Sequence, residues 1–351
     1  MSVGSAAKPT GHRQYRVDPP SSWLRPDSHI ERILEHPWYR SLLHLLDVGA
    51  WGSHCYFRAR GATQALLPVT TGAISSPMGR GSDSEPVLAQ IGGHGVYLAD
   101  SMQFMLELTA RIERRPTYYV MPSFRGERAD HRHLNQFFHV EAELPGGRED
   151  AMGWAEGLVR ALAAQLLEDA EAEILAMGGS PDTLAAFAAG TSPFRRIGHD
   201  DALALLADDA AALRREGDEV VVTNHGEREL CRRLGDFTWL TDMPRANVPF
   251  YQAVLPARSD RTATADLLAG IGETLGLGER AATEHDVLAN LAYCEVDSAP
   301  YDWYLKIKRM HALPTAGFGL GLERFLMWCV GGKDIRNFCL LLRDSSGRGS
   351  P

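Results

Sequence analysis

The chain has 351 residues, of which 44% are hydrophobic and 23% charged, so it can bury a full core as one large domain with an insertion. Its formal net charge of −9 argues against a broad nucleic-acid-binding surface, which requires clustered Lys and Arg. The five cysteines are odd in number and lack Cys-x-x-Cys spacing, so they support neither a disulfide framework nor a zinc site. No apolar run reaches transmembrane length and no signal peptide is visible, so we expect a cytoplasmic protein without membrane contact.

The chain begins with a polar, proline-rich segment, 1–26, which we expect to be a flexible arm. Residues 28–48 are expected to form one helix, because their apolar residues recur with helical spacing: Ile30, Ile33, Leu34, Leu42, Leu43 and Leu46. A catalytic domain is expected over 27–344, followed by a disordered tail, 345–351.

Two strands joined by a polar loop are predicted over residues 118–144, from a β-rich run and a second run that alternates apolar and acidic residues. This hairpin places Arg125 and Glu127 at the end of one strand and Phe137 at the start of the next. A cation, a carboxylate and an aromatic ring together can hold an α-phosphate, the amino group of adenine and the face of its ring. The alternative is an ordinary amphipathic hairpin with a charged tip.

The segment 147–236 is rich in alanine and predicted to be mainly helical, with a helical stripe at Trp154, Leu158, Leu162, Leu166 and Ile174. We interpret it as an insertion at the edge of a sheet, with a solvated outer face.

Near the C-terminus, glycines alternate with other residues over 316–321, and a helix-forming run follows. Alternating glycines allow a strand to lie close to a flat ligand, because no side chain projects from every second position. The helix would place Arg324 at the strand-to-helix junction, where a rigid five-donor cation suits a polyphosphate. The alternative is a glycine-rich strand that only packs on a helix.

The hairpin and the glycine strand together resemble motifs 2 and 3 of the class II aminoacyl-tRNA synthetases, in particular the asparaginyl/aspartyl branch. The resemblance spans roughly Tyr97 to Arg343 and includes an Asp-x-Pro block at 241–251 and the run Tyr-Asp-Trp-Tyr-Leu at 301–305. It implies an α+β fold, with a mostly antiparallel sheet flanked by helices. It also implies a homodimer that pairs near residues 33–57.

The resemblance further implies that ATP and Mg²⁺ bind, with Arg125 and Arg324 as catalytic residues. The residues expected to bind ATP are Arg125, Glu127, His131, Arg132, His133, Phe137 and Arg324. Asp266 and Glu273, seven residues apart, match an acidic pair that holds Mg²⁺ on the phosphates, and carboxylate oxygens are the ligands this ion prefers. The alternative is scattered charges in a glycine-rich turn.

The amino-acid pocket implied by the resemblance contains Ser101, Gln103, Glu141 and Arg280. Leu106 stands where aspartyl enzymes carry a lysine that binds the side-chain carboxylate. A glutamate such as Glu141 accepts hydrogen bonds from an amide or an ammonium group and repels a carboxylate. The pocket is therefore asparaginyl-like, with Arg280 as its anion-binding residue.

The catalytic sequence starts soon after the first predicted helix, so we expect the anticodon-binding barrel of this branch to be missing. Together with the loop 68–83, this resembles the archaeal-type asparagine synthetases. The loop could cover a substrate or be only a flexible connection. The resemblance implies that the carboxylate of aspartate or a close analogue is adenylated and its acyl group transferred to ammonia or an amine.

Three alternatives stay open: a truncated asparaginyl-tRNA synthetase that acts on tRNA, a ligase that joins an amino acid to another acceptor in a specialised pathway, and a non-catalytic amino-acid sensor. A sensor would not need both Mg²⁺ ligands, so the complete set of expected ATP and metal residues argues against it. The sequence does not decide between the other acceptors.

Overall fold

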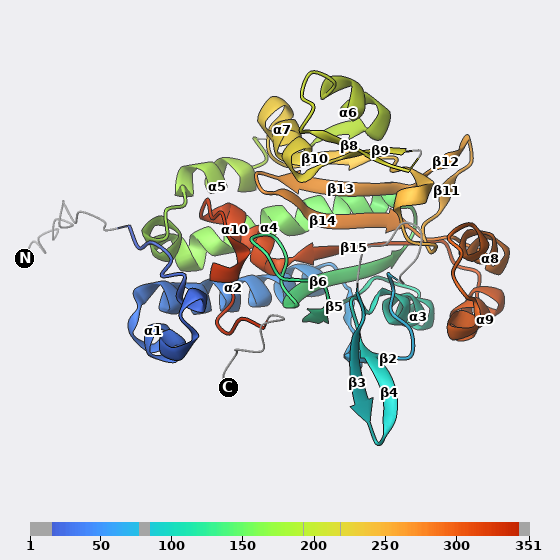
Figure 1. The fold of residues 1–351 in the computed structure, drawn as a ribbon, viewed down its shortest axis with the longest axis horizontal. Coiled ribbons are helices and arrows are strands. Elements are labelled where there is room, and N and C mark those ends of the chain that lie inside the picture. Colours follow the sequence, from blue (N-terminus) through green and yellow to red (C-terminus); the bar gives the residue numbers. More distant parts are fainter. Residues whose placement is uncertain (1–15, 77–84, 192, 218, 344–351) are drawn as a thin grey trace, which may run out of the picture.

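The computed structural model describes residues 16–76, 85–191, 193–217 and 219–343. An eight-stranded sheet forms its centre, in the order β1-β5-β6-β15-β14-β13-β10-β7 (Figure 1). The strands are β1 Thr63–Gln64, β5 Thr117–Phe124, β6 Gln136–Pro145, β15 Thr315–Gly321, β14 Gly272–Glu279, β13 Thr264–Ala269, β10 Thr238–Thr241 and β7 Arg195–Gly198. The two pairs at the ends of this sheet, β1 with β5 and β10 with β7, are parallel, and every other pair is antiparallel. The mostly antiparallel α+β fold predicted from the sequence is confirmed.

Two long helices, α2 (Pro37–Ala59) and α4 (Arg148–Ala176), lie along one face of the sheet (Figure 1). The core is continuous between them and the strands, and Phe57 stacks on Tyr118 with 4.4 Å between ring centroids. The edge position predicted for α4 is wrong: Leu158, Leu162 and other residues of its stripe are fully buried. The helix is covered because α2 packs on one side of it and the sheet on the other.

The rest of the insertion does lie toward the β10–β7 end of the sheet (Figure 1). It consists of α5 (Pro181–Ala188), β7, α6 (His199–Leu205), the hairpin of β8 (Leu213–Glu216) and β9 (Glu219–Val222), and α7 (Asn224–Leu234).

The N-terminal part differs from the sequence prediction. Residues 1–15 of the expected flexible arm lie outside the described residues, but Val17 donates a backbone hydrogen bond to Ala176 at 2.7 Å, so the described part contacts the body. In place of one helix there are two, α1 (His29–Glu35) and α2, because Pro37 restricts His36 to an extended conformation. The imidazole of His36 then caps α2 by accepting from the backbone N–H of Trp38 at 3.3 Å. The predicted tail, 345–351, lies outside the described residues.

The remaining elements border one end of the sheet (Figure 1). They are α3 (Gln103–Glu113), β2 (Thr70–Thr71), β3 (Val87–Ile91), β4 (His94–Leu98), β11 (Val254–Leu255), β12 (Arg258–Thr262), α8 (Glu284–Tyr293) and α9 (Asp302–Met310). Helix α10 (Leu322–Cys329) follows β15 and packs against α2 and β6 instead. The β3–β4 hairpin extends away from the body. None of the helices in the described residues is long and apolar enough to cross a membrane.

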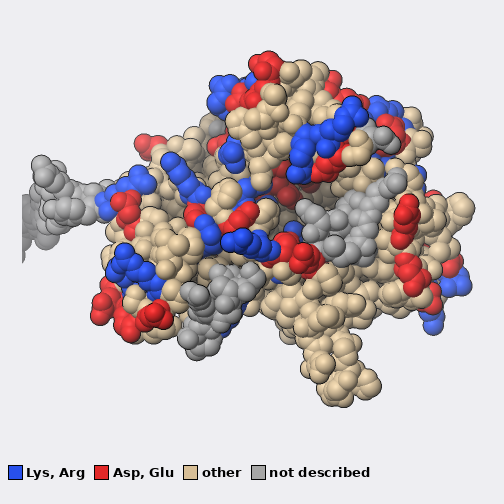
Figure 2. Space-filling view, viewed as in Figure 1, with Lys and Arg blue, Asp and Glu red and all other residues tan. Residues whose placement is uncertain are grey.

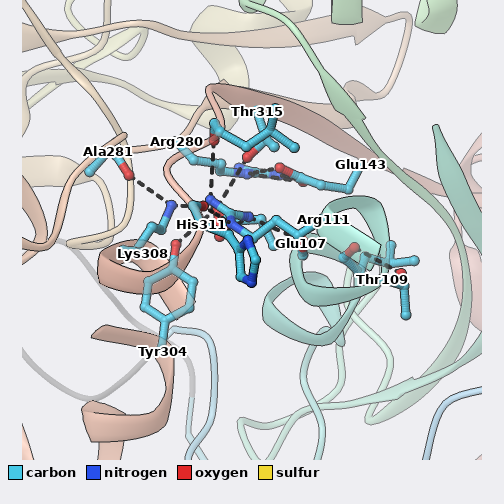
Figure 3. Close-up of polar contacts among 12 residues, drawn as sticks. Glu107, Thr109, Arg111, Glu143, Arg280, Ala281, Tyr304, Lys308, His311 and Thr315 are labelled. Atoms are coloured by element: carbon cyan, nitrogen blue, oxygen red, sulfur yellow. Dashed lines mark hydrogen bonds and ion pairs between the residues drawn. The ribbon is translucent and has the colours of Figure 1, made fainter. Parts of the chain in front are cut away.

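A buried network of charged side chains joins α3 and α9 to the sheet (Figure 3). The carboxylate of Glu107 on α3 accepts from three groups, which are Lys308 Nζ at 2.6 Å, Tyr304 Oη at 3.1 Å and Thr315 Oγ1 at 3.1 Å. Burial opposes ionisation of this carboxyl, but Lys308 and Arg111 outweigh it and lower its pKa. In the same network, Glu143 on β6 holds the guanidinium of Arg280 through Nε at 3.1 Å and Nη2 at 2.9 Å.

Candidate active site

The floor of the site is a row of residues that runs across four strands. The strand register aligns Glu141 on β6 with Gly319 on β15, Gly319 with Gly276 on β14, and Gly276 with Asp266 on β13. We call these four residues the floor row. A Cβ atom added to Gly319 would lie 3.1 Å from the carboxylate of Glu141, and one added to Gly276 would lie 3.1 Å from that of Glu273. The two glycines therefore leave a space bounded by carboxylates.

Two adjoining cavities lie over this floor. One, of about 290 Å³, contains Ser101, Gln103, Glu141 and Arg280. The other, of about 170 Å³, contains Arg125, Phe137 and Arg324. After the ligands expected from the sequence resemblance, we call them the amino-acid cavity and the nucleotide cavity. Five residues line both: Arg125, His139, Glu273, Gly276 and Gly319. The structure thus brings together residues from segments that are more than two hundred positions apart in the chain.

In the nucleotide cavity, Phe137 and Arg125 lie close together, with 5.7 Å between the guanidinium carbon and the ring centroid. Arg125 Nε is buried and has no hydrogen-bond partner among the described residues, so it is available to a ligand. Arg324 lines the same cavity and is held in place, because its Nη1 donates to the backbone oxygen of Glu273 at 2.7 Å. A cavity lined by an aromatic ring and two guanidinium groups suits a flat, anionic ligand.

Of the other residues predicted to bind ATP, two line the nucleotide cavity and two do not. Arg132 and His133 line the nucleotide cavity, and burial together with Arg324 lowers the pKa of His133. Glu127 does not line it, and its Oε2 accepts from the backbone N–H of Glu85 at 3.2 Å. His131 lines a different cavity, on the other side of Arg132. The sequence alone did not show that His133 lines the nucleotide cavity and His131 does not, because both belong to one irregular loop.

The predicted acidic pair lies at the junction of the two cavities. Burial, then the nearby carboxylates of Glu273 and Glu227, raise the pKa of Asp266. Burial also acts to raise the pKa of Glu273, but Arg324, Arg125 and Arg132 outweigh burial and lower this pKa.

This pair suits a Mg²⁺ ion that is completed by phosphate oxygens and water. The described residues contain no group of three or more His, Cys, Asp or Glu side chains that could hold a metal ion alone. Mg²⁺ usually takes one or two carboxylates and completes its shell with substrate phosphates and water, so Asp266 and Glu273 fit this ion.

Glu227 on α7 is a site residue that the sequence did not reveal. Its Oε2 accepts from Arg132 Nη2 at 3.0 Å and from the backbone N–H of Glu273 at 3.1 Å. Burial raises the pKa of this carboxyl, against the effect of Arg132. It links the loop of the predicted hairpin to β14, the strand that carries Glu273, and no motif in the sequence marks it.

In the amino-acid cavity, Glu141 already has neighbours. Ser101 Oγ donates to its Oε2 at 2.6 Å, and His139 Nδ1 lies 2.8 Å from its Oε1. Burial opposes ionisation, but His139 and Ser101 lower the pKa of Glu141, so this carboxyl is charged. Gln103 Nε2 is buried without a hydrogen-bond partner among the described residues, so it can donate to a ligand.

Arg280 lines this cavity, whereas Leu106 does not. The Nη1 of Arg280 faces Gln252 Oε1 at a long 3.4 Å, while its other donors are held by Glu143. One donor edge of the guanidinium is thus left for a ligand oxygen. Leu106, placed in this corner by the sequence interpretation, does not line the cavity: it is fully buried in a cluster with Ala99, Met102 and Tyr119.

The sequence and the fold of the chain are similar to those of known proteins. Residues 58–344 match the family described as tRNA synthetases class II (D, K and N). An asparagine–tRNA ligase of Lactococcus lactis subsp. cremoris (strain SK11) is 29% identical over 331 residues, which cover 89% of this chain and 72% of that protein. An asparagine–tRNA ligase of Thermoplasma acidophilum is 28% identical over 248 residues, covering 70% of this chain and 56% of that protein.

Among solved structures, the asparaginyl-tRNA synthetase from Pyrococcus horikoshii complexed with asparaginyl-adenylate superposes with a TM-score of 0.83. The likeness covers 92% of this chain and 73% of that one, at 24% identity. At this identity it establishes the fold.

Glu323, at the wall of the nucleotide cavity, provides a pH-dependent term in stability. Burial raises the pKa of its carboxyl to about 8, although the backbone N–H of Phe138 donates to both of its oxygens, at 3.0 and 3.1 Å. The unfolded carboxyl releases its proton near pH 4.5. The folded state therefore binds more protons between these values, and this group makes stability fall as pH rises through that window.

We expect Glu323→Gln to remove this dependence, because the amide cannot ionise. In urea unfolding at pH 5 and pH 8, the variant should gain stability relative to wild type as pH rises. Glu31→Gln, at an exposed position on α1, is the matched control, and its free energy of unfolding should differ from that of the wild type by the same amount at both pH values. The same difference at both pH values for Glu323→Gln would contradict the role assigned to Glu323.

Proposed function

The chain belongs to the class II tRNA synthetases (D, K and N), a family of ATP-dependent ligases, and we propose that it activates asparagine with ATP and transfers it to tRNA. The observation that carries this proposal is the contiguity of the two cavities over the floor row. An amino acid in one cavity and a nucleotide in the other would meet at Arg125, which lines both.

In the proposed first step, an oxygen of the substrate carboxylate bonds to the α-phosphorus, and the bond from that phosphorus to the pyrophosphate oxygen breaks. Arg125 lies at the junction and would offset the charge that builds on the α-phosphate, while Arg324 would hold the nucleotide from the other side. Mg²⁺ bound by Asp266 and Glu273 would neutralise charge on the phosphate oxygens. In the second step an acceptor hydroxyl attacks the acyl carbon, and AMP leaves.

The choice of asparagine rests on the charges of the amino-acid cavity. The ionised Glu141 can accept from an amide or ammonium group and would repel a second carboxylate. The free edge of Arg280 can donate to the side-chain carbonyl oxygen. The relatives reported above are named for joining asparagine to tRNA, so the ammonia acceptor expected from the sequence gains no support from them.

The substrates can be tested directly. With enzyme, ATP and Mg²⁺, we expect ATP–pyrophosphate exchange with asparagine and little with aspartate, and formation of asparaginyl-tRNA when tRNA is added. Formation of asparagine and AMP from aspartate and ammonium would replace the proposal with an amide ligase. Absence of exchange with every amino acid would favour a sensor.

Replacing Arg125, which lines both cavities, tests its proposed role at the α-phosphate. Arg125→Ala should slow pyrophosphate exchange by roughly 100- to 1,000-fold, as when one transition-state donor is removed. Arg128→Ala changes an exposed arginine of the same loop and is the matched control. An exchange rate that is equally affected in both variants would refute the role of Arg125.

We also propose a homodimer that pairs through α2. On this helix 56% of the surface of Leu43 and 62% of that of Trp51 are exposed, so the monomer leaves apolar area uncovered that a second copy of the chain can bury. Sedimentation velocity at micromolar concentration should give a dimer for the wild type and a monomer for Leu43→Glu/Trp51→Glu. A monomeric wild type would contradict the proposal.

A further inference from the structure

A third cavity, of about 710 Å³, lies behind Arg132 and has no part in the reaction described above. It is bounded by the α4–α5 turn, the α7–β10 loop, the β13–β14 turn and the end of α10 with the loop that follows. Its volume lies within the range of sites for small molecules, about 300–1,000 Å³. Arg132 lines both this cavity and the nucleotide cavity, so the two are neighbours with a common wall.

The inner surface of this cavity is apolar and contains one half-buried indole. Leu184, Ile271 and Met327 line it together with Trp328. The indole Nε1 is already satisfied, because it donates to Asp236 Oδ2 at 3.0 Å. The exposed part of Trp328 therefore offers an apolar surface and no free polar group, as a flat hydrophobic ligand requires.

The polar groups at the border are mainly positive. Arg228 and Lys333 are exposed, and neither forms an ion pair or side-chain hydrogen bond with another described residue. Asp236 is the only carboxylate among the described lining residues, and both of its oxygens are occupied, by Trp328 and by the backbone N–H of Gly270 at 2.8 Å. The border thus has two uncompensated cations and no carboxylate with a free oxygen to balance them.

We propose that this cavity binds a small ligand with a flat apolar body and one anionic group, a carboxylate, sulfonate or phosphate. The apolar body lies against Trp328 and Ile271, and the anion is held by Arg228 and Lys333. The ligand binds at the same time as ATP, because Arg132 separates the two cavities and its Nη2 is held by Glu227.

The binding site can be tested with 8-anilinonaphthalene-1-sulfonate, an aromatic sulfonate whose fluorescence rises in apolar cavities. We expect saturable binding of one dye per chain, and retention of the dye when ATP and Mg²⁺ are added to saturation. The variant Arg228→Gln/Lys333→Gln should weaken this binding by roughly tenfold or more, because both charge-assisted contacts are lost.

Two controls make the result specific. Arg215→Gln/Lys306→Gln removes the same charges from exposed positions outside the cavity, and it should bind the dye like the wild type. The neutral probe N-phenyl-1-naphthylamine should bind both double variants and the wild type equally. Non-saturable dye binding, displacement of the dye by ATP, or equal affinity in the two double variants would overturn the proposal.

Discussion

The buried ion network beneath the amino-acid cavity is the constraint on which the site depends. Charges that leave water must be compensated, and here Glu107 and Glu143 are surrounded by Lys308, Arg111 and Arg280. With these groups ionised, two negative charges face three positive ones. Lys308 and Arg111 both face Glu107, whereas Glu143 holds Arg280 on the border of the cavity, so the network both ties α3 and α9 to the sheet and fixes the guanidinium whose remaining donor edge can meet a ligand oxygen (Figure 3).

Charge is distributed differently on the outer surface. On the face drawn in Figure 2, lysines and arginines are interspersed with acidic residues, and the protruding β3–β4 hairpin has no charged side chain. The exposed ion pairs contribute little, because water and salt screen them. Charged groups therefore affect ligand binding most strongly inside the two cavities over the floor row, where carboxylates and guanidinium groups are shielded from solvent.

Local patterns in the sequence predicted two central strands correctly. The alternating glycines identified β15, and the apolar–acidic alternation identified β6, because strand periodicity places every second residue on one face. Asp266 and Glu273 were singled out because their spacing matches an acidic pair of the family, and their binding of Mg²⁺ stays a prediction. Glu227 and Glu107 could not be singled out, because each acts through partners that are distant in the sequence. The position of α4 was missed for a similar reason: an apolar stripe within an alanine-rich segment does not show which surface covers it.

The position of β15 in the sheet has a consequence for biosynthesis. This strand lies between β6 and β14, and it is the last strand of the chain among the described residues. The floor row therefore has a gap until residues 315–321 have left the ribosome, since β6 and β14 have no other connection across the sheet. Such long-range pairing is slow compared with local contacts. A nascent chain thus carries two unjoined sheet edges late in synthesis, when protection by chaperones matters most for a sheet of this topology.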